Sequence, residues 1–472
     1  MKSSEFNKLS PFGDGSGISS YLDPRIEIFI NKYGFYEEKY LGVEEVILNP
    51  LISKVASNLI HESSRESAKP YFSNISGIKL NDEIGYYKSL YIGNVIDNHL
   101  RMTSSSGGLG TWILMKLMKE NHIDYAIHVK KNFDKTSNIL FKYQVSENID
   151  QIFDGAKTRY YPVELSEVLT EIKEKPGRYA IVGVPSVIRS IKKLCQVDKA
   201  INERIKHCIV LICGHQKSSK FAEYMGWQAG ILPGQLSDID FRHKFKDRPA
   251  DLYGIKISGK INGESKSLVM KKEDLDGQDW GQGFFKAPYS DFTDDVFGEC
   301  GDMVIGDAWL PGYVKDSKGT NIIIARSLEM ERLIKKGLSD RELNLKKTDP
   351  KTILSSQAGH YQHTYLELPY RAKKAKKIFD YEPQSFIPIS PNITLLRKAI
   401  QTTRLQISTK SHRAYNQAAK MLNIRYFKNQ MVFLKLKYRL LYIIFRLLNK
   451  IFQGSKQKKG RVNSTPLKKS KN

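Results

Sequence analysis

The chain has 472 residues and a formal net charge of +25 at pH 7, and 40% of its residues are hydrophobic. This length predicts two or three domains, and the apolar fraction is sufficient for a core. The charge is uneven, because residues 401–472 contain eighteen Lys and Arg and no Asp or Glu. Residues 1–400 are therefore only mildly basic, which argues against a core that binds a specific nucleic acid.

Cysteine usage and the absence of a leader pattern predict a cytoplasmic protein. The 4 cysteines have no paired spacing, so we expect a reducing compartment and no disulfide framework. The first residues lack the apolar core of a signal peptide. The sequence contains no run of about eighteen apolar residues, so we expect no transmembrane helix.

Five units are predicted along the chain. Residues 1–84 contain loop-forming Gly and Pro but no cysteine and no clear hydrophobic period. Strands and helices alternate from residue 85, and we divide this part into units 85–175, 176–335, 336–400 and 401–472.

A polar run that ends in two glycines, residues 101–111 (RMTSSSGGLGT), stands between a strand-like run and a helical pattern. A helix start offers free N–H groups and the positive end of its dipole, and glycine lets a ligand approach closely. These features favour a phosphate or another anion. The run is neither a Walker loop nor a GxGxxG pattern. The alternative is an ordinary helix start capped by Ser.

Two apolar strands end in small or polar residues, within residues 177–186 and 206–215, and a helical pattern follows each. Continuous apolar strands that alternate with helices predict parallel structure, in which ligands bind beyond the carboxyl ends of the strands. We therefore predict an α/β fold with mixed, largely parallel sheets, flanking helices and a basic helical tail.

Two candidate catalytic residues, His215 and Asp307, stand at the ends of predicted strands. The alternatives are a hydrogen-bonded structural histidine and an ordinary Asx turn. Cys213 alone is typical of a small buried hydrophobic residue. His360 and His363 are spaced for a metal on a helix, but no acidic third ligand is evident. We expect a solvated loop there and predict no metal site.

Five short motifs, in this order, are similar to those of the coenzyme F420 hydrogenase/dehydrogenase beta-subunit family. The resemblance covers about residues 85–330 and includes both the N-terminal and C-terminal family modules. The motifs are Arg101 with Ser104-Ser105-Ser106-Gly107-Gly108, Gly183-Val184-Pro185-Ser186, Cys213-Gly214-His215, Ser290-Asp291-Phe292 and Gly306-Asp307-Ala308-Trp309.

The resemblance implies a flavoprotein that binds FAD and exchanges electrons with a partner such as coenzyme F420. The protein would orient the flavin, which carries out the hydride chemistry. The resemblance also implies a link to polysaccharide biosynthesis, because related bacterial proteins are often encoded beside such genes. The cofactor contacts expected on this basis are Arg101, Ser104, Ser105, Ser106, Gly107, Gly108, Thr111, Gly183, Pro185, Gly214 and Gly306.

The chain departs from the family at the cysteines that hold 4Fe-4S clusters. Ser186, Ala287 and Ser290 stand where the family usually has Cys, and residues 1–194 contain none. A cluster needs about four thiolates, and Cys213 with Cys300 cannot supply them. We therefore predict no iron–sulfur cluster.

The C-terminal part predicts a basic amphipathic helix over residues 431–452 and a disordered end from Gly454. Such a helix either lies on an anionic membrane surface or packs on the body of the protein. Three functional hypotheses remain. They are a cluster-free flavin oxidoreductase acting on a small or glycan-linked substrate, a redox-inactive nucleotide- or glycan-binding protein, and a membrane-surface assembly protein of a polysaccharide pathway. A protein partner is compatible with each.

Overall fold

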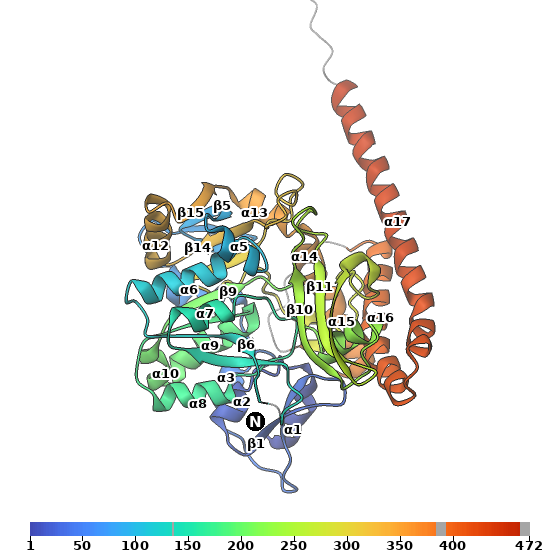
Figure 1. The fold of residues 1–472 in the computed structure, drawn as a ribbon, viewed down its shortest axis with the longest axis horizontal. Coiled ribbons are helices and arrows are strands. Elements are labelled where there is room, and N and C mark those ends of the chain that lie inside the picture. Colours follow the sequence, from blue (N-terminus) through green and yellow to red (C-terminus); the bar gives the residue numbers. More distant parts are fainter. Residues whose placement is uncertain (135, 384–392, 463–472) are drawn as a thin grey trace, which may run out of the picture.

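The computed structural model describes residues 1–134, 136–383 and 393–462, with side chains as far as Ile451. Its centre is an eight-stranded sheet with helices on both faces (Figure 1). In spatial order the strands are β15 (Leu343–Lys347), β5 (Ser89–Val95), β14 (Asn321–Ala325), β13 (Met303–Asp307), β9 (Ile205–Leu211), β8 (Tyr179–Gly183), β6 (Tyr125–Lys131) and β7 (Phe141–Ser146).

The sheet is mixed but largely parallel, as predicted. Strands β6, β8, β9 and β13 pair in parallel, and β5 shares their direction because β14 is antiparallel to both β5 and β13. Strands β7, β14 and β15 run the opposite way. The carboxyl ends of five parallel strands therefore lie along one edge of the sheet.

Alternating side chains fill a core on each face of the sheet. Ile181 and Val210 point to one face, and Ala180 and Ile209 point to the other. The first core is covered by α2 (Ile18–Leu22), α4 (Ser64–Phe72), α8 (Ser166–Glu174), α9 (Pro185–Val197) and α10 (Lys199–Arg204). The second is covered by α5 (Asn98–Thr103), α6 (Leu109–Lys119), α7 (Ile149–Asp154) and α12 (Leu328–Ser339).

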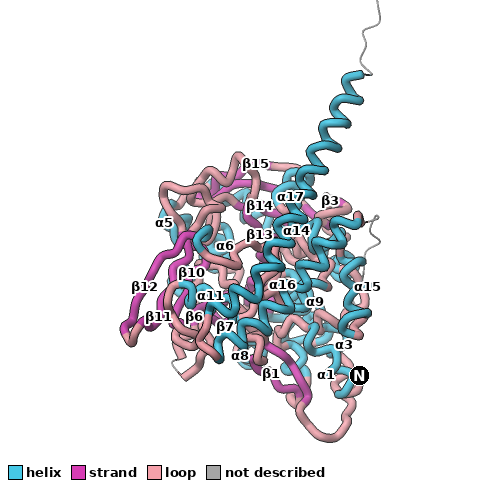
Figure 2. Tube along the Cα trace, turned by 90° about the vertical axis from the view of Figure 1, so that its right-hand side faces the viewer, coloured by secondary structure: helices cyan, strands magenta, loops and turns pink. Residues whose placement is uncertain are grey.

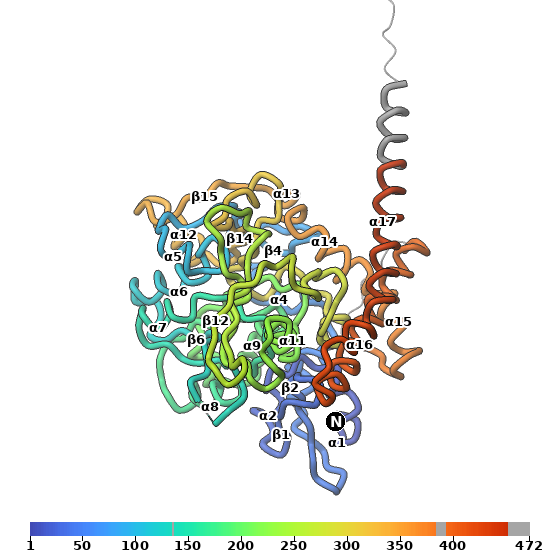
Figure 3. Tube along the Cα trace, turned by 45° about the vertical axis from the view of Figure 1, so that its right-hand side comes forward, coloured from blue at the N-terminus to red at the C-terminus, as the bar shows by residue number. Residues whose placement is uncertain are grey.

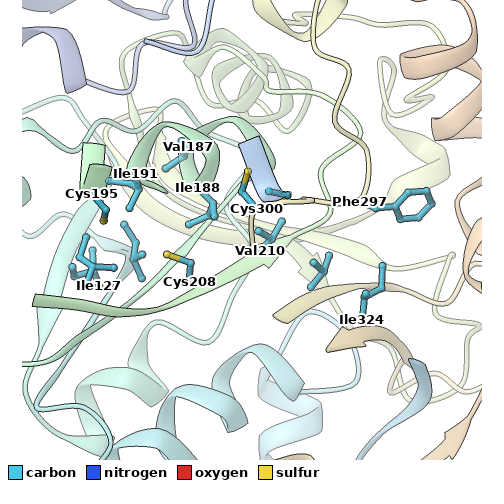
Figure 4. Packing of buried hydrophobic residues seen from close by; sticks show 14 of the residues in the cluster. Ile127, Val187, Ile188, Ile191, Cys195, Cys208, Val210, Phe297, Cys300 and Ile324 are labelled. Carbon is cyan, nitrogen blue, oxygen red and sulfur yellow. The ribbon is translucent and has the colours of Figure 1, made fainter. Parts of the chain in front are cut away.

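Three of the four cysteines belong to the first core. Cys195 on α9, Cys208 on β9 and Cys300 before β13 lie among isoleucines and valines (Figure 4). Burial raises the pKa of the Cys195 thiol to about 11 and that of Cys300 to about 12. These side chains therefore pack as apolar residues.

A second body lies beside the sheet and has its own core. It combines an antiparallel sheet of β10 (Leu236–His243), β11 (Gly254–Ile261) and β12 (Glu264–Lys271) with α11 (Ser219–Gln228) and two long helices. The long helices are α16 (Leu395–Lys420) and α17 (Ile424–Val462), which pack side by side (Figure 2). Thr394 caps α16 by accepting a hydrogen bond from the Arg397 N–H.

Smaller elements complete the fold. The N-terminal ones are α1 (Ser3–Leu9), η1 (Ser10–Phe12), β1 (Ile26–Ile30), β2 (Tyr36–Tyr40), α3 (Ile52–Val55), β3 (Lys79–Asn81) and β4 (Gly85–Tyr87). The later ones are η2 (Lys272–Asp274), η3 (Pro288–Asp291), α13 (Pro350–Ser356), α14 (Ala358–Tyr361), the π-helical turn η4 (Gln362–Leu366) and α15 (Leu368–Phe379).

Several local predictions need correction. His360 and His363 lie in α14 and η4 rather than in a solvated loop, and His363 contacts Gln401 and Tyr442. Helix α17 continues through residues 454–462, which were predicted to be disordered, and residues 463–472 lie outside the described part. The division into five units stays a prediction. Its boundaries at 335 and 400 fall inside α12 and α16.

Within the described residues, none of the helices combines the length and apolarity needed to cross a bilayer.

Candidate functional site

A cavity of about 1530 Å³ lies at the carboxyl edge of the parallel strands, between the main sheet and the second body. Small-ligand pockets usually measure roughly 300–1,000 Å³, so this one has room for a dinucleotide and a second molecule. Parts of the chain far apart in sequence form its wall. They include residues 10–14, 104–111, 155–163, 211–217, 305–311 and 355–360 and one face of α16.

The serine–glycine loop (residues 104–108) leads into α6 at this cavity. Gly108 occupies the N-cap with φ +89°, a left-handed conformation that favours glycine, and α6 has no side-chain cap. The Ser-capped alternative is therefore wrong. Gly110 and Thr111 line the cavity, and within the described residues their N–H groups have no hydrogen-bond partner. This helix start is suited to an anion.

The three serines of the loop have different partners. Ser105 Oγ accepts a hydrogen bond from the Thr158 N–H at 2.8 Å, and Ser106 Oγ donates to the Thr320 carbonyl at 3.2 Å. The buried Ser104 Oγ has no partner among the described residues, although Ser104 lines the cavity. Buried polar atoms without partners are rare and call for an explanation, such as a missing ligand.

Three predicted contact residues lie behind the cavity wall. Arg101 Nη2 donates hydrogen bonds to Asp316 Oδ2 at 2.6 Å and to the Gly319 carbonyl at 2.7 Å, so it links the start of the loop to residues 316–319. Pro185 begins α9. A Cβ on Gly107 would lie 2.6 Å from Asn321 Oδ1 and 3.0 Å from the Asn321 nitrogen, so this glycine lets the loop pack on β14. All three support the loop or its neighbours without lining the cavity.

The other predicted contacts line the cavity. They are Ser104, Ser105, Ser106, Gly108, Thr111, Gly183, Gly214 and Gly306. The candidate catalytic residues His215 and Asp307 line it too. The sheet topology thus brings these residues together, and their roles toward a ligand stay predictions.

Lys244 is a loop-holding residue that the sequence did not indicate. It donates to the carbonyls of Arg101, Ser106 and Lys318, the last two at 2.7 and 2.6 Å. Burial is the main cause that lowers the Lys244 pKa to about 7. In the sequence it stands among other charged residues and looks like part of a solvated run.

Asp307 is engaged in a buried ion pair. Arg242 Nη1 and Nη2 lie 3.1 and 3.3 Å from the two Asp307 carboxylate oxygens, and Arg242 Nη1 lies 3.3 Å from the Tyr160 hydroxyl. Burial opposes the charge of Arg242, but Asp307 outweighs it and raises the Arg242 pKa. The Asp307 carboxylate is thus engaged by Arg242, and it orients this guanidinium at the cavity rather than standing as a free base.

His215 lies against the Trp280 ring, with ring centroids 4.6 Å apart. Its Nε2 is buried and has no partner within the described residues. Burial, together with nearby Lys217 and Lys286, lowers the His215 pKa well below its usual value, so the ring is neutral at pH 7. Lys217 is itself buried, with Nζ 2.6 Å from the Phe284 carbonyl and 4.8 Å from the Trp280 ring centre.

Histidines from the C-terminal third reach the same cavity, which the sequence pattern did not indicate. His360 and His412 line it, and the Nδ1 atom of each lacks a partner among the described residues. Burial lowers the pKa of each to about 4. His412 Nε2 lies 3.1 Å from the Lys286 carbonyl. No local signal joins residues so distant in sequence.

Within the described residues, no group of three or more His, Cys, Asp or Glu is arranged to hold a metal ion. Of the cysteines, Cys213 lines the cavity, and burial raises its pKa to about 11. Ser290 Oγ, beside the same cavity wall, accepts a hydrogen bond from the Gln216 N–H.

Comparisons with known protein families agree with the motifs. The family description "Coenzyme F420 hydrogenase/dehydrogenase, beta subunit" matches twice, its N-terminal part over residues 90–170 and its C-terminal part over residues 177–351. A chain from a structure of the F420-reducing [NiFe] hydrogenase complex from Methanosarcina barkeri is 13% identical, with a TM-score of 0.47. That match covers 63% of this chain and 96% of the other. A comparison with curated protein sequences gives no match. Because the two family regions span more than half of its residues, the chain belongs to the coenzyme F420 hydrogenase/dehydrogenase beta-subunit family.

Proposed function

We propose that this protein is an FAD-dependent oxidoreductase that works without an iron–sulfur cluster. The observation that carries the proposal is the cavity at the carboxyl edge of the sheet, where α6 begins with unpartnered N–H groups. Such a helix start accepts phosphate, and FAD carries two phosphates. The unpartnered Ser104 Oγ fits a ligand that lies against this loop.

When bound, FAD supplies two-electron hydride transfer, and the protein supplies binding and orientation. On this proposal the Gly110 and Thr111 N–H groups hold a phosphate. Trp280 and Tyr160, whose ring centroids are 4.6 Å apart, offer aromatic surfaces for a flat ring system. Neutral His215 is the best-suited proton acceptor at the cavity, and Asp307 acts by holding Arg242. Both roles belong to the proposal.

The substrate side of the proposal is a small or glycan-linked molecule, or coenzyme F420 itself, in a cytoplasmic pathway such as polysaccharide biosynthesis. The cavity volume supports this part of the proposal, because it exceeds that of usual single-ligand pockets and leaves space for a substrate beside FAD. A second candidate function is a redox-inactive nucleotide- or glycan-binding protein. The observation that favours it is the ion pairing of Asp307, which removes one of the two predicted catalytic groups.

The first test is the absorption spectrum of the purified protein, with mass spectrometry of any compound that acid releases. The proposal expects flavin bands without a broad iron–sulfur shoulder. Ser105→Ala should weaken retention of FAD, because Ser105 joins the loop to Thr158. Gly107→Ala should weaken it more, because its Cβ would push Asn321 away from the start of α6.

Gly312→Ala is the matched control, since its Cβ would meet no atom within 4 Å and Gly312 does not line the cavity. This variant should retain FAD like the natural chain. A colourless protein that takes up no added FAD would exclude the oxidoreductase. Binding of a nucleotide or sugar nucleotide by that colourless protein would instead favour the second candidate.

A further inference from the structure

Helix α17 carries two apolar faces, and only one of them packs on the protein. The inward face places Phe427, Met431, Leu434 and Tyr438 in the core that α16 also lines. Partly buried Leu441, Tyr442 and Phe445 continue this contact. This inward face alone is therefore sufficient to pack α17 on the body of the protein.

The outward face is a stripe of exposed apolar side chains along the same helix. Phe433 is 70% exposed, Leu440 58% and Ile451 65%. The stripe repeats every three or four residues, which keeps it on one side of a helix. Its members are Phe433, Leu436, Leu440, Ile443, Ile444, Leu447, Leu448 and Ile451.

The stripe continues past the end of the body. Helix α17 starts against α16 and then projects beyond the rest of the protein (Figure 3), and Figures 1 and 2 agree. Leu447, Leu448 and Ile451 lie on the outer part. A monomeric protein rarely exposes such a continuous apolar surface unless it meets a partner or a membrane.

The charges beside the stripe decide between a second copy of the protein and a membrane. Lys437, Arg439, Arg446 and Lys450 border the stripe, and none has an ion pair within the described residues. Residues 401–472 contain no Asp or Glu, so two copies of α17 would bring together only positive charges. Like charges across an interface oppose pairing, whereas an apolar stripe flanked by Lys and Arg suits an anionic lipid surface.

We propose that the outward face of α17 binds the protein to an anionic membrane surface, with the helix lying in the interface. The apolar stripe enters the boundary between headgroups and acyl chains, and the bordering cations meet lipid phosphates. Residues that enter the membrane are distinct from those that hold the helix on the body. The fold and the cavity therefore remain intact whether or not the protein is bound. This membrane proposal does not depend on whether the cavity binds FAD.

The test is sedimentation of the full chain with phosphatidylcholine vesicles, with and without phosphatidylglycerol. We expect binding to the anionic vesicles that weakens as salt is added, because salt screens exposed charges. The double variant Leu440→Glu with Leu447→Glu should lose at least about tenfold in vesicle binding, since it puts charge on the exposed stripe that would enter the membrane. Arg439→Gln with Lys450→Gln should lose about tenfold on anionic vesicles only.

The matched control is Leu80→Glu with Val269→Glu, at apolar residues of β3 and β12 that are 55% and 44% exposed. It should bind vesicles like the natural chain. Light scattering gives the mass of each variant in solution. The proposal is overturned if the natural chain ignores anionic vesicles, or if Leu440→Glu with Leu447→Glu binds them unchanged. It is also overturned if that double variant only converts a dimer to a monomer, since the stripe would then join two copies.

Discussion

The two ends of the cavity balance their charges in different ways. At the serine–glycine loop each buried cation has its own partner, since Arg101 pairs with Asp316, Arg242 with Asp307, and Lys244 bonds backbone carbonyls. Around Trp280, Lys217 has no acidic partner within the described residues and contacts the Phe284 carbonyl and two aromatic rings. The first end is a frame that holds backbone N–H groups in position. At the second end, ring nitrogens of His215, His360 and His412 have no partner among the described residues.

The largest expected effect lies at the balanced end. Asp307→Ala should lower the free energy of unfolding by about 3–5 kcal/mol, because Arg242 would remain buried without its carboxylate. Urea denaturation measures this change. Adding Arg242→Met should restore much of the loss, since the uncompensated charge is then gone. If Asp307→Ala unfolds like the natural chain, the balanced frame described for this end is wrong.

An intermediate effect is expected at the other end, as a pH dependence. Burial chiefly, with Lys217 in support, lowers the pKa of His412 from 6.5 to about 4. Between these values the unfolded chain binds a proton that the folded chain does not, so stability is full above pH 6.5 and falls toward pH 4. The full pKa shift corresponds to about 3 kcal/mol.

His412→Gln should remove this contribution while keeping an N–H for the Lys286 carbonyl. Unfolding measured from pH 7 to 4 should then lose less stability than in the natural chain. An unchanged slope would mean that His412 is not held neutral in the fold.

The smallest effect has the opposite sign and gives the sharpest contrast between the ends. Lys217→Met should raise the free energy of unfolding at pH 7 by about 1–2 kcal/mol, because a buried amine that has no acidic partner among the described residues is replaced by an apolar chain of similar length. Thermal unfolding measures it. Lys199→Met, at a side chain that is 88% exposed, is the control and should change little. A clear loss of stability in Lys217→Met would indicate that this end is balanced too.

Local patterns in the sequence were sufficient for most strands of the main sheet and for one wall of the cavity. The apolar strands before Gly183 and before Cys213, and the loop before α6, are short signals that the structure confirms. Strand β15 was not predicted, because its five residues lie at the sheet edge and alternate with charge. Strand β10 (Leu236–His243) was not predicted either.

The other wall depends on contacts that no local pattern records. His412 lines the same cavity as His215 because α16 packs across the second body, and His360 lines it from α14. His363 looked solvated because its partners, Gln401 and Tyr442, lie far along the chain. The helix in the basic tail was predicted correctly. Its packed and exposed apolar faces can be distinguished only once the packing of α17 is known.

Helix α17 also determines where the chain can be cut. A stop codon before Met431 would strip Tyr415 and Phe427 of the side chains that cover them, and would open the second body. A stop codon after Phe445 would keep every packed residue of the helix and remove only its projecting end. Crystallisation and cryogenic imaging would gain a more compact particle from the second cut.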